Sequence, residues 1–229
     1  MMRTIQEQLS IVIPVLDDAE GLAALLAVLG RVPLVREIIV VDGGSSDGST
    51  AVAAAAGAQV IVAPRGRGGQ LAAGAAEAMG KWLLFLHADC RPLQGWEAAV
   101  RGFIDGGVGE VAGYFALALD DPAPAARRLE RFVAWRCRTL ALPYGDQGLL
   151  VSQRLYDAVG GYRTLPLMED VDLVRRLGRA RLRPVGATML ASARRYRRDG
   201  YRRRSLRNLC CLALYFAGVP PKAIARMYG

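Results

Sequence analysis

Acidic side chains follow three strand-like runs of apolar residues in this sequence. The runs are Leu9–Pro14, Glu37–Val41 and Lys81–Leu86, and the acids that follow them are Asp18, Asp42 and Asp89. In open sheets of parallel strands, ligands bind beyond the carboxyl ends of the strands. Three carboxylates that converge on one sheet edge therefore indicate a polar ligand site, although an Asp after a strand is often only a helix N-cap.

Two further carboxylates, Glu169 and Asp170, lie in the first turn of a segment with helical periodicity, Met168–Leu177. The positive end of a helix dipole favours an ionised carboxylate, which can then accept a proton. The alternative is that both residues only start the helix.

His87 is the only histidine of the chain, so any histidine-dependent triad or metal site must use it. The four cysteines, Cys90, Cys137, Cys210 and Cys211, form no C-x-x-C pair. This spacing favours neither a disulfide framework nor a zinc site, and we expect buried or inert thiols in a reducing compartment.

The elements that must position these residues alternate between strand and helix through the first 90 residues. We expect helices over Ala19–Gly30, Ser49–Ala56 and Gln70–Met79, and a further strand over Gln59–Ala63. This alternation predicts right-handed crossovers and a mostly parallel sheet flanked by helices. The loop Gly43–Gly48 is not a G-x-G-x-x-G fingerprint, so a dinucleotide-dependent oxidoreductase is not indicated.

The second half of the chain is less regular. We expect strands over Val111–Leu119 and Gly148–Ser152, a strand pair within Arg183–Ala193, and helices over Gly95–Ile104, Ala125–Leu140, Gln153–Val159, Tyr201–Gly218 and Pro221–Met227. We divide the chain into an α/β domain, residues 1–193, and a basic C-terminal helical appendage, residues 194–229.

Charge is distributed unevenly along the 229 residues, whose net charge is +9. Residues 1–115 hold 8 basic and 12 acidic side chains, whereas residues 116–229 hold 22 and 9. Eight arginines fall within 194–207, before the apolar run Leu209–Val219, which is too short to span a membrane. These features suit a helix packed on the core or an anionic membrane surface, and suit nucleic acid less well.

Four segments resemble, in this order, family 2 glycosyltransferases with the GT-A fold. They are SIVIPVLDDAE, IIVVDGGSSDGST, GKWLLFLHADC and LMEDVDLVRRL. The resemblance implies a Rossmann-like GT-A sheet and an inverting transfer of a sugar from a nucleotide-diphosphate donor, UDP, to a hydroxyl of a small-molecule or lipid acceptor. The segment RGRGGQLAAGAAEA and the small size are also similar to a bacterial subgroup associated with arsenosugar biosynthesis. We expect a cytoplasmic protein, with attachment to the inner face of the membrane left open.

The resemblance also implies roles for individual residues. Asp170 matches the catalytic base, with Glu169 beside it, and Asp42 would accept a hydrogen bond from the base of the nucleotide. His87-Ala88-Asp89 stands at the place of the family's D-x-D motif, so Asp89 would ligate Mg²⁺ or Mn²⁺. His87 is either a second ligand, which favours Mn²⁺, or a neutral side chain near the ribose. The other donor-binding residues implied are Pro14, Leu16 and Asp18. Either Arg65 or Arg67 would approach the nucleotide, and we choose Arg67. One of Arg194, Arg195 and Arg198 would face the diphosphate, and we choose Arg195.

Two other functions stay open on the sequence. A sugar-phosphate nucleotidyltransferase can share this topology, but it would normally have a glycine-rich phosphate loop after the first strand, which Leu16–Gly21 lacks. A non-catalytic protein that binds a membrane surface or RNA is the other alternative, and the replacement of an Asp by His87 is its best support.

Overall fold

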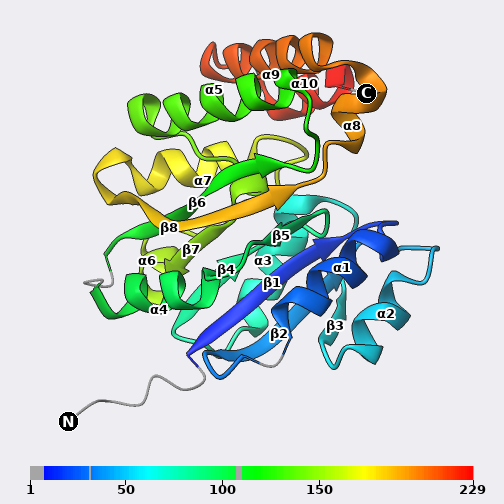
Figure 1. The fold of residues 1–229 in the computed structure, drawn as a ribbon, viewed down its shortest axis with the longest axis vertical. Coiled ribbons are helices and arrows are strands. Elements are labelled where there is room, and N and C mark those ends of the chain that lie inside the picture. The colour runs from blue at the N-terminus through cyan, green and yellow to red at the C-terminus, as the bar shows by residue number, and fades with distance from the viewer. Residues whose placement is uncertain (1–7, 31, 107–109, 229) are drawn as a thin grey trace.

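The computed structural model describes residues 8–30, 32–106 and 110–228 (Figure 1). Within these residues, eight strands form one sheet in the order β3-β2-β1-β4-β7-β6-β8-β5. Their bounds are β1 Leu9–Val15, β2 Val35–Asp42, β3 Gln59–Val62, β4 Trp82–Phe85, β5 Cys90–Pro92, β6 Ala112–Leu119, β7 Leu149–Ser152 and β8 Leu182–Ala191.

The sheet is mostly parallel, as predicted. Strands β1 to β4 pair in parallel, and so do β6 and β8. Strand β7 runs antiparallel to both of its neighbours, β4 and β6, and β5 runs antiparallel to β8. Because β1, β2 and β4 point the same way, the residues that follow them meet at one edge of the sheet.

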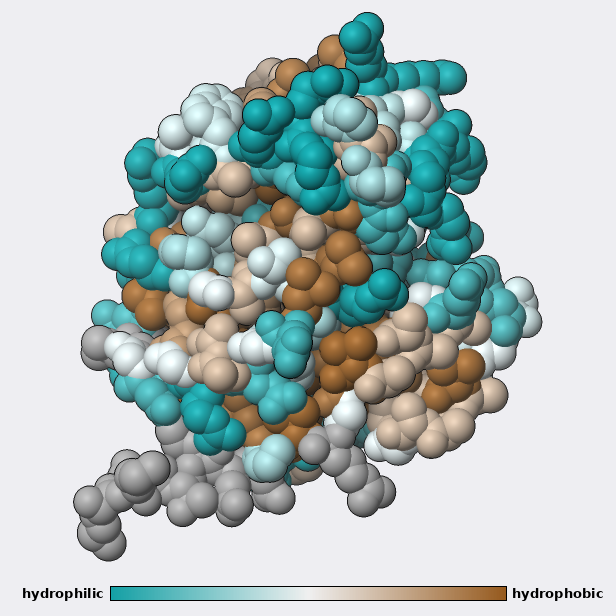
Figure 2. Space-filling model, in the orientation of Figure 1, coloured by the Kyte–Doolittle hydropathy of each residue, from teal (hydrophilic) through white to brown (hydrophobic). Residues whose placement is uncertain are grey.

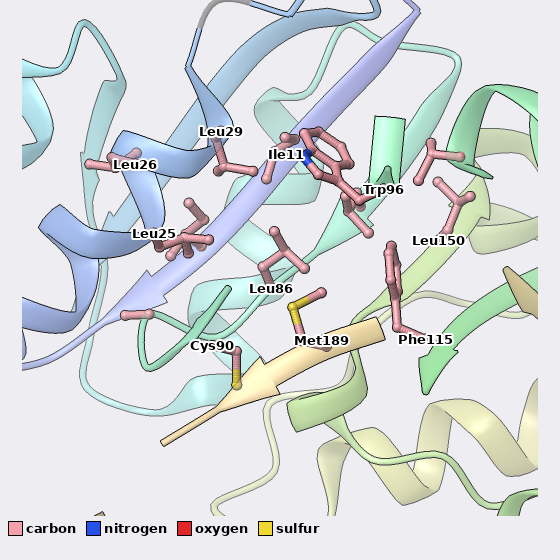
Figure 3. Close-up of a cluster of buried hydrophobic side chains, with 14 of the residues drawn as sticks. Ile11, Leu25, Leu26, Leu29, Leu86, Cys90, Trp96, Phe115, Leu150 and Met189 are labelled. Carbon is pink, nitrogen blue, oxygen red and sulfur yellow. The ribbon is translucent and has the colours of Figure 1, made fainter. Parts of the chain in front are cut away.

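Helices cover both faces of the sheet, because side chains of successive strand residues point to opposite faces. Their bounds are α1 Ala19–Leu29, α2 Ser49–Ala55, α3 Arg67–Glu77, α4 Trp96–Gly106, α5 Pro124–Leu140, α6 Gln153–Ala158, α7 Glu169–Leu177, α8 Arg194–Asp199, α9 Tyr201–Phe216 and α10 Pro221–Tyr228. Ile11 and Ile13 pack under α1 and α4 in one buried apolar cluster, whereas Val12 belongs to a second cluster with residues of α3, α5 and α7. Figure 3 shows Ile11, Leu25, Trp96 and Phe115 among the side chains of the first cluster.

The strand pair predicted within Arg183–Ala193 is wrong, because this segment belongs to the single strand β8. Gly186 has a φ of +89°, and the register against β6 shifts between Tyr114 and Ala116. A glycine with positive φ can form either a turn between two strands or a bulge within one strand. Here Gly186 forms a bulge, so the strand continues.

Helix α3 begins at Arg67, three residues earlier than predicted, so the expected loop at 65–69 is partly helical. Gly68 lets this first turn approach the segment before α7, since a Cβ there would collide with the Arg163 carbonyl oxygen. The short elements β5 and α8 were not expected from the sequence.

The C-terminal helices pack on the rest of the molecule (Figure 1). Leu212 of α9 joins the second apolar cluster, and the Tyr201 hydroxyl donates to Asp121 at 2.8 Å. The Tyr215 hydroxyl donates to Asp172 of α7 at 3.4 Å. Among the helices of the described residues, none is long and apolar enough to cross a membrane.

Candidate active site

A cavity of about 210 Å³ opens where β4, the turn Gly145–Gln147 and the first turn of α7 come together. Residues from seven parts of the chain line it, and one wall is made by α9 through Arg204, Asn208 and Cys211. The titratable groups around it include His87, Asp89, Asp146, Glu169 and Asp170, together with the guanidinium groups of Arg67, Arg195 and Arg204. The structure thus brings together the residues predicted for the metal, the base and the diphosphate.

Asp170 is held as a hydrogen-bond acceptor at both of its carboxylate oxygens. The Gly145 backbone N–H donates to Oδ2 at 3.1 Å, and the Tyr162 hydroxyl donates to Oδ1 at 3.1 Å. Glycine at position 145 leaves room for both side chains where they lie, because a Cβ there would collide with His87 Nε2 and Asp170 Oδ2. Burial and the neighbouring carboxylates of Asp170 and Glu169 raise the pKa of Tyr162 well above its usual value, so this hydroxyl keeps its proton.

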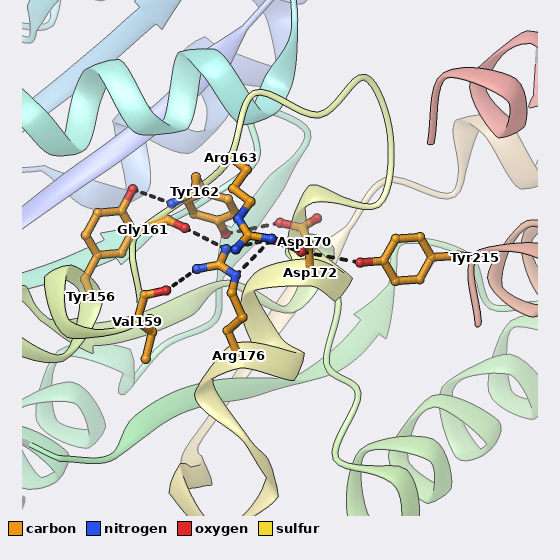
Figure 4. A network of polar contacts seen from close by, with 9 residues as sticks. All are labelled: Tyr156, Val159, Gly161, Tyr162, Arg163, Asp170, Asp172, Arg176 and Tyr215. Atoms are coloured by element: carbon orange, nitrogen blue, oxygen red, sulfur yellow. Dashed lines mark hydrogen bonds and ion pairs between the residues drawn. The ribbon is translucent and has the colours of Figure 1, made fainter. Parts of the chain in front are cut away.

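Tyr162 is itself fixed by its surroundings (Figure 4). Its backbone N–H donates to the Tyr156 hydroxyl at 2.9 Å, and its ring packs edge-on against Phe85. Arg176 joins this turn to α7, because its guanidinium bonds the Gly161 carbonyl at 2.7 Å and Asp172 at 2.6 Å. The phenol that orients Asp170 therefore has little freedom to turn away.

Glu169 is buried next to Asp170 and forms an ion pair with Arg67 at 3.3 Å. Burial, and then the charge of Asp170, raise the pKa of Glu169 to about 7, and Arg67 acts against this rise. Helix α3 supplies Arg67 from its first residue, so the close approach at Gly68 also explains how this pair forms.

His87 is an unprotonated imidazole at neutral pH. Burial, and then the charge of Arg67, lower its pKa to about 4, although Asp170 and Asp89 oppose this. Within the described part of the chain, its Nε2 is buried without a hydrogen-bond partner, 3.9 Å from Asp170 Oδ2. A neutral ring nitrogen without a partner can coordinate a metal ion or form a hydrogen bond to a bound molecule.

Asp89 completes the candidate metal centre. Possible ligand atoms of His87, Asp89 and Cys90 lie within 4.8 Å of one another. Burial would raise the pKa of Asp89, but the charges of His87 in acid and of Arg195 and Arg67 lower it below its usual value. An ionised carboxylate beside an imidazole without a partner fits a divalent cation that also takes oxygen ligands from a bound molecule.

Of the three candidate arginines of α8, the structure brings Arg195 to the cavity. Arg194 instead forms an ion pair with Asp18 at 3.3 Å, and Arg198 pairs with Asp199 at 2.7 Å. Asp18 therefore faces an arginine of α8 and lines a neighbouring cavity of about 230 Å³ on the other side of Asp89.

The residues predicted for the nucleotide base lie outside the lining of both cavities. Pro14 is buried and Leu16 is half-buried at the end of β1. The Asp42 carboxylate accepts the backbone N–H groups of Gly44 at 2.9 Å and Ser45 at 3.0 Å, so it caps its own loop. Recognition of a base by Asp42 stays a prediction.

Two residues of the site were not predicted to carry chemistry. From the sequence we assign Asp146 no catalytic or ligand-binding role, but burial raises the pKa of this carboxyl to about 6, against the charge of Arg136. Its Oδ1 is buried without a partner among the described residues. Tyr162 had no distinguishing signal, because its contact with Asp170 depends on the packing of a turn against α7.

Comparison with known proteins agrees with this arrangement. Residues 10–156 match the family model described as Glycosyl transferase family 2. No protein of curated function matches the sequence.

Solved structures share the fold. Glucosyl-3-phosphoglycerate synthase from Mycobacterium tuberculosis, in complex with Mn²⁺, UDP and glucosyl-3-phosphoglycerate, is 21% identical, with a TM-score of 0.56 over 81% of this chain and 70% of that chain. The same enzyme with Mg²⁺ and UDP is 20% identical, with a TM-score of 0.56 and the same coverage of 81% and 70%. These similarities confirm the predicted GT-A fold. Because the family model spans more than half of the chain, the protein belongs to glycosyl transferase family 2.

Proposed function

We propose that this protein is an inverting glycosyltransferase that moves a sugar from a UDP-sugar donor to a hydroxyl of a small-molecule or lipid acceptor, with Mg²⁺ or Mn²⁺ as cofactor. The observation that carries the proposal is the position of Asp170, oriented as an acceptor in the same cavity as Asp89 and His87. The structurally similar mycobacterial enzyme, which was solved with UDP, Mn²⁺ and UDP-glucose, supports the choice of donor and cation.

Asp89 and His87 would hold the cation, since they offer an ionised carboxylate and an imidazole nitrogen without a partner. When bound, a divalent cation supplies Lewis-acid compensation for the negative charge that develops on the departing diphosphate. Arg195 and Arg67 add positive charge at the same cavity, and a guanidinium can pair with two phosphate oxygens.

Asp170 would accept the proton of the acceptor hydroxyl. As this proton moves to the carboxylate, the hydroxyl oxygen forms a bond to the anomeric carbon and the bond from that carbon to the phosphate oxygen breaks. Attack and departure take place on opposite faces of the sugar, so the configuration inverts. The hydrogen bonds from Tyr162 and Gly145 orient the carboxylate for this step.

The donor's nucleoside would lie beside Pro14, Leu16 and Asp42 at the carboxyl ends of β1 and β2. Gln70 holds these two strand ends together, because its side-chain amide donates to the carbonyl oxygens of Val15 at 2.9 Å and Val41 at 2.8 Å. A donor that binds Asp18 would have to compete with the ion pair between Asp18 and Arg194.

Calorimetry with UDP, with and without Mn²⁺, tests the donor site. We expect Mn²⁺ to strengthen UDP binding to the wild type and Asp89→Asn to remove this gain. Asp170→Asn should abolish transfer while UDP affinity stays within a few-fold of the wild type. Asp105→Asn, at an exposed carboxylate on α4, is the matched control.

Two results would overturn the proposal. UDP affinity that is the same with and without Mn²⁺, and unchanged in Asp89→Asn, would remove the cation from this site. Release of pyrophosphate from a nucleoside triphosphate and a sugar phosphate would instead identify the nucleotidyltransferase alternative.

A further inference from the structure

An apolar groove of about 530 Å³ lies between the end of α5, the second half of α7 and α9. Leu140, Val174, Leu209 and Phe216 line it, with Arg175 and Arg179 among its residues. We call the groove and the adjoining exposed sides of α5 and α9 the α5–α9 face. It lies at the end of the molecule where Figure 1 shows α5 and α9, and Figure 2 shows hydrophobic residues there among hydrophilic ones.

Large apolar side chains are exposed on this face. Phe132 and Trp135 of α5 stack with their ring centroids 5.7 Å apart and are 47% and 48% exposed. Leu206, Leu209 and Phe216 of α9 are exposed as well. Exposed apolar residues that gather beside an apolar groove mark an interaction surface, whereas scattered single ones do not.

Basic side chains flank these apolar groups. Arg128, Arg131 and Arg138 are exposed on α5, and their spacing from Phe132 and Trp135 places them on the same stripe of the helix. Arg202 and Arg203 are exposed on α9. The sequences of α9 and α10 contain no acidic residue, and the one acid of α5, Glu130, pairs with Arg127 at 2.9 Å.

The arginine-rich segment 194–207 does not supply most of this charge. Arg194 and Arg197 pair with Asp18 and Asp120 of the α/β region. Three more of its arginines pair with one carboxylate, that of Asp199; they are Arg198, Arg204 and Arg207. The positive charge directed outward beside apolar groups is therefore on α5 and on the outer side of α9.

We propose that the α5–α9 face docks on the surface of an anionic lipid bilayer. Proteins that attach to the membrane interface typically place tryptophan at the level of the headgroups and arginines toward the anionic phosphates. Their apolar surface faces the boundary of the acyl chains. The charge of the face argues for this occupant, because a second copy would bring its own arginines against those of the first. The inference is independent of the proposed transfer reaction.

The fluorescence emission of Trp135 can report binding of the α5–α9 face to a membrane. The other tryptophans of the chain, Trp82 and Trp96, are 6% and 3% exposed, so a change in emission on binding reports Trp135. With vesicles of phosphatidylcholine and phosphatidylglycerol at a ratio of about 7:3, we expect flotation at low salt, loss of flotation in high salt, and a blue-shifted emission. Trp135→Phe should float like the wild type without the emission shift.

Variants separate the two contributions to docking. Arg128→Gln combined with Arg131→Gln should lower partitioning onto anionic vesicles about twenty-five-fold, since each arginine near such a surface contributes about fivefold. Phe132→Ser combined with Trp135→Ser should also lower it, and the urea midpoint of each variant reports that it is folded. Val62→Ser, at a side chain that is 74% exposed on β3, is the control and should bind like the wild type.

Three results would overturn the proposal. Equal flotation with pure phosphatidylcholine would remove the role of charge. Absence of flotation on anionic vesicles, together with a dimer by light scattering that Trp135→Ser disrupts, would assign the face to a second copy. Absence of flotation together with salt-sensitive binding of RNA would assign it to nucleic acid.

Discussion

The raised pKa of Glu169 in the candidate active site should make the unfolding free energy of the protein depend on pH, and Glu169→Gln tests this prediction. The carboxyl is 3% exposed, and its pKa is raised from 4.5 to about 7, first by burial and then by Asp170. A carboxyl that binds its proton more tightly in the folded state stabilises the fold most at low pH. This stability is lost progressively as the pH rises from 4.5 through about 7.

The size of the effect follows from the shift in pKa. A rise from 4.5 to about 7 corresponds to between about 3 and 4 kcal/mol of unfolding free energy lost above pH 7, at about 1.4 kcal/mol for each pKa unit. Between about pH 5 and about pH 8 most of this amount, between about 2 and 3 kcal/mol, should be lost from the wild type. Glutamine carries no titrating proton, so the variant should not show this part of the pH dependence.

Urea unfolding of both proteins at about pH 5 and about pH 8 measures the difference. The change in unfolding free energy between the two pH values is compared between wild type and variant. The contributions of the other titrating groups to this change are shared by both proteins and cancel in the comparison. Glu77→Gln, which removes an exposed carboxylate from α3, reports the effect of losing one negative charge.

An identical pH dependence in the wild type and Glu169→Gln would refute this reasoning. It would mean that Arg67 keeps Glu169 ionised in the folded state across the whole range. Glu169 would then be a charged neighbour of Asp170 instead of a partly protonated one.

Three further predictions concern the groups around Asp170. Tyr162→Phe removes one hydrogen bond to a carboxylate, worth about 2 kcal/mol, and should lower kcat roughly thirtyfold while KM for the donor changes little in steady-state assays. Gly145→Ala places a methyl group against His87 and Asp170, and should lower both activity and the Tm measured by scanning fluorimetry. Arg136→Ala removes a buried guanidinium that lies 3.5 Å over the Tyr144 ring and bonds Gln147, and should reduce the urea-measured stability by about 3 kcal/mol.

The fold was largely predictable because its signals are local. Short apolar runs bounded by glycine and aspartate mark β1 to β4 to within two residues at each end. Strand β8 was misread because Gly186 breaks the local pattern, and only its pairing with β6 shows that the strand continues. The type of a glycine does not distinguish a bulge from a turn when the partner strand is unknown.

The position of a site residue was predictable where it depends only on the place of that residue after a strand, as at Asp89. It was not predictable where a role depends on rotation or on distant packing. Arg194, Arg195 and Arg198 look equivalent in sequence, and the orientation of α8 decides that Arg195 faces the cavity. Tyr162 reaches Asp170 only because a turn folds back on α7.

Helix α9 forms a wall of two cavities at once. Arg204, Asn208 and Cys211 border the candidate active site, and Leu209, Leu212 and Phe216 border the apolar groove from the same helix. Because α9 is one continuous helix, a displacement of α9 at the groove would also move the residues that border the candidate active site. If attachment to a surface changes donor affinity by some factor, thermodynamic reciprocity requires the donor to change surface affinity by the same factor. Occupied and empty enzyme would then partition differently between solution and bilayer.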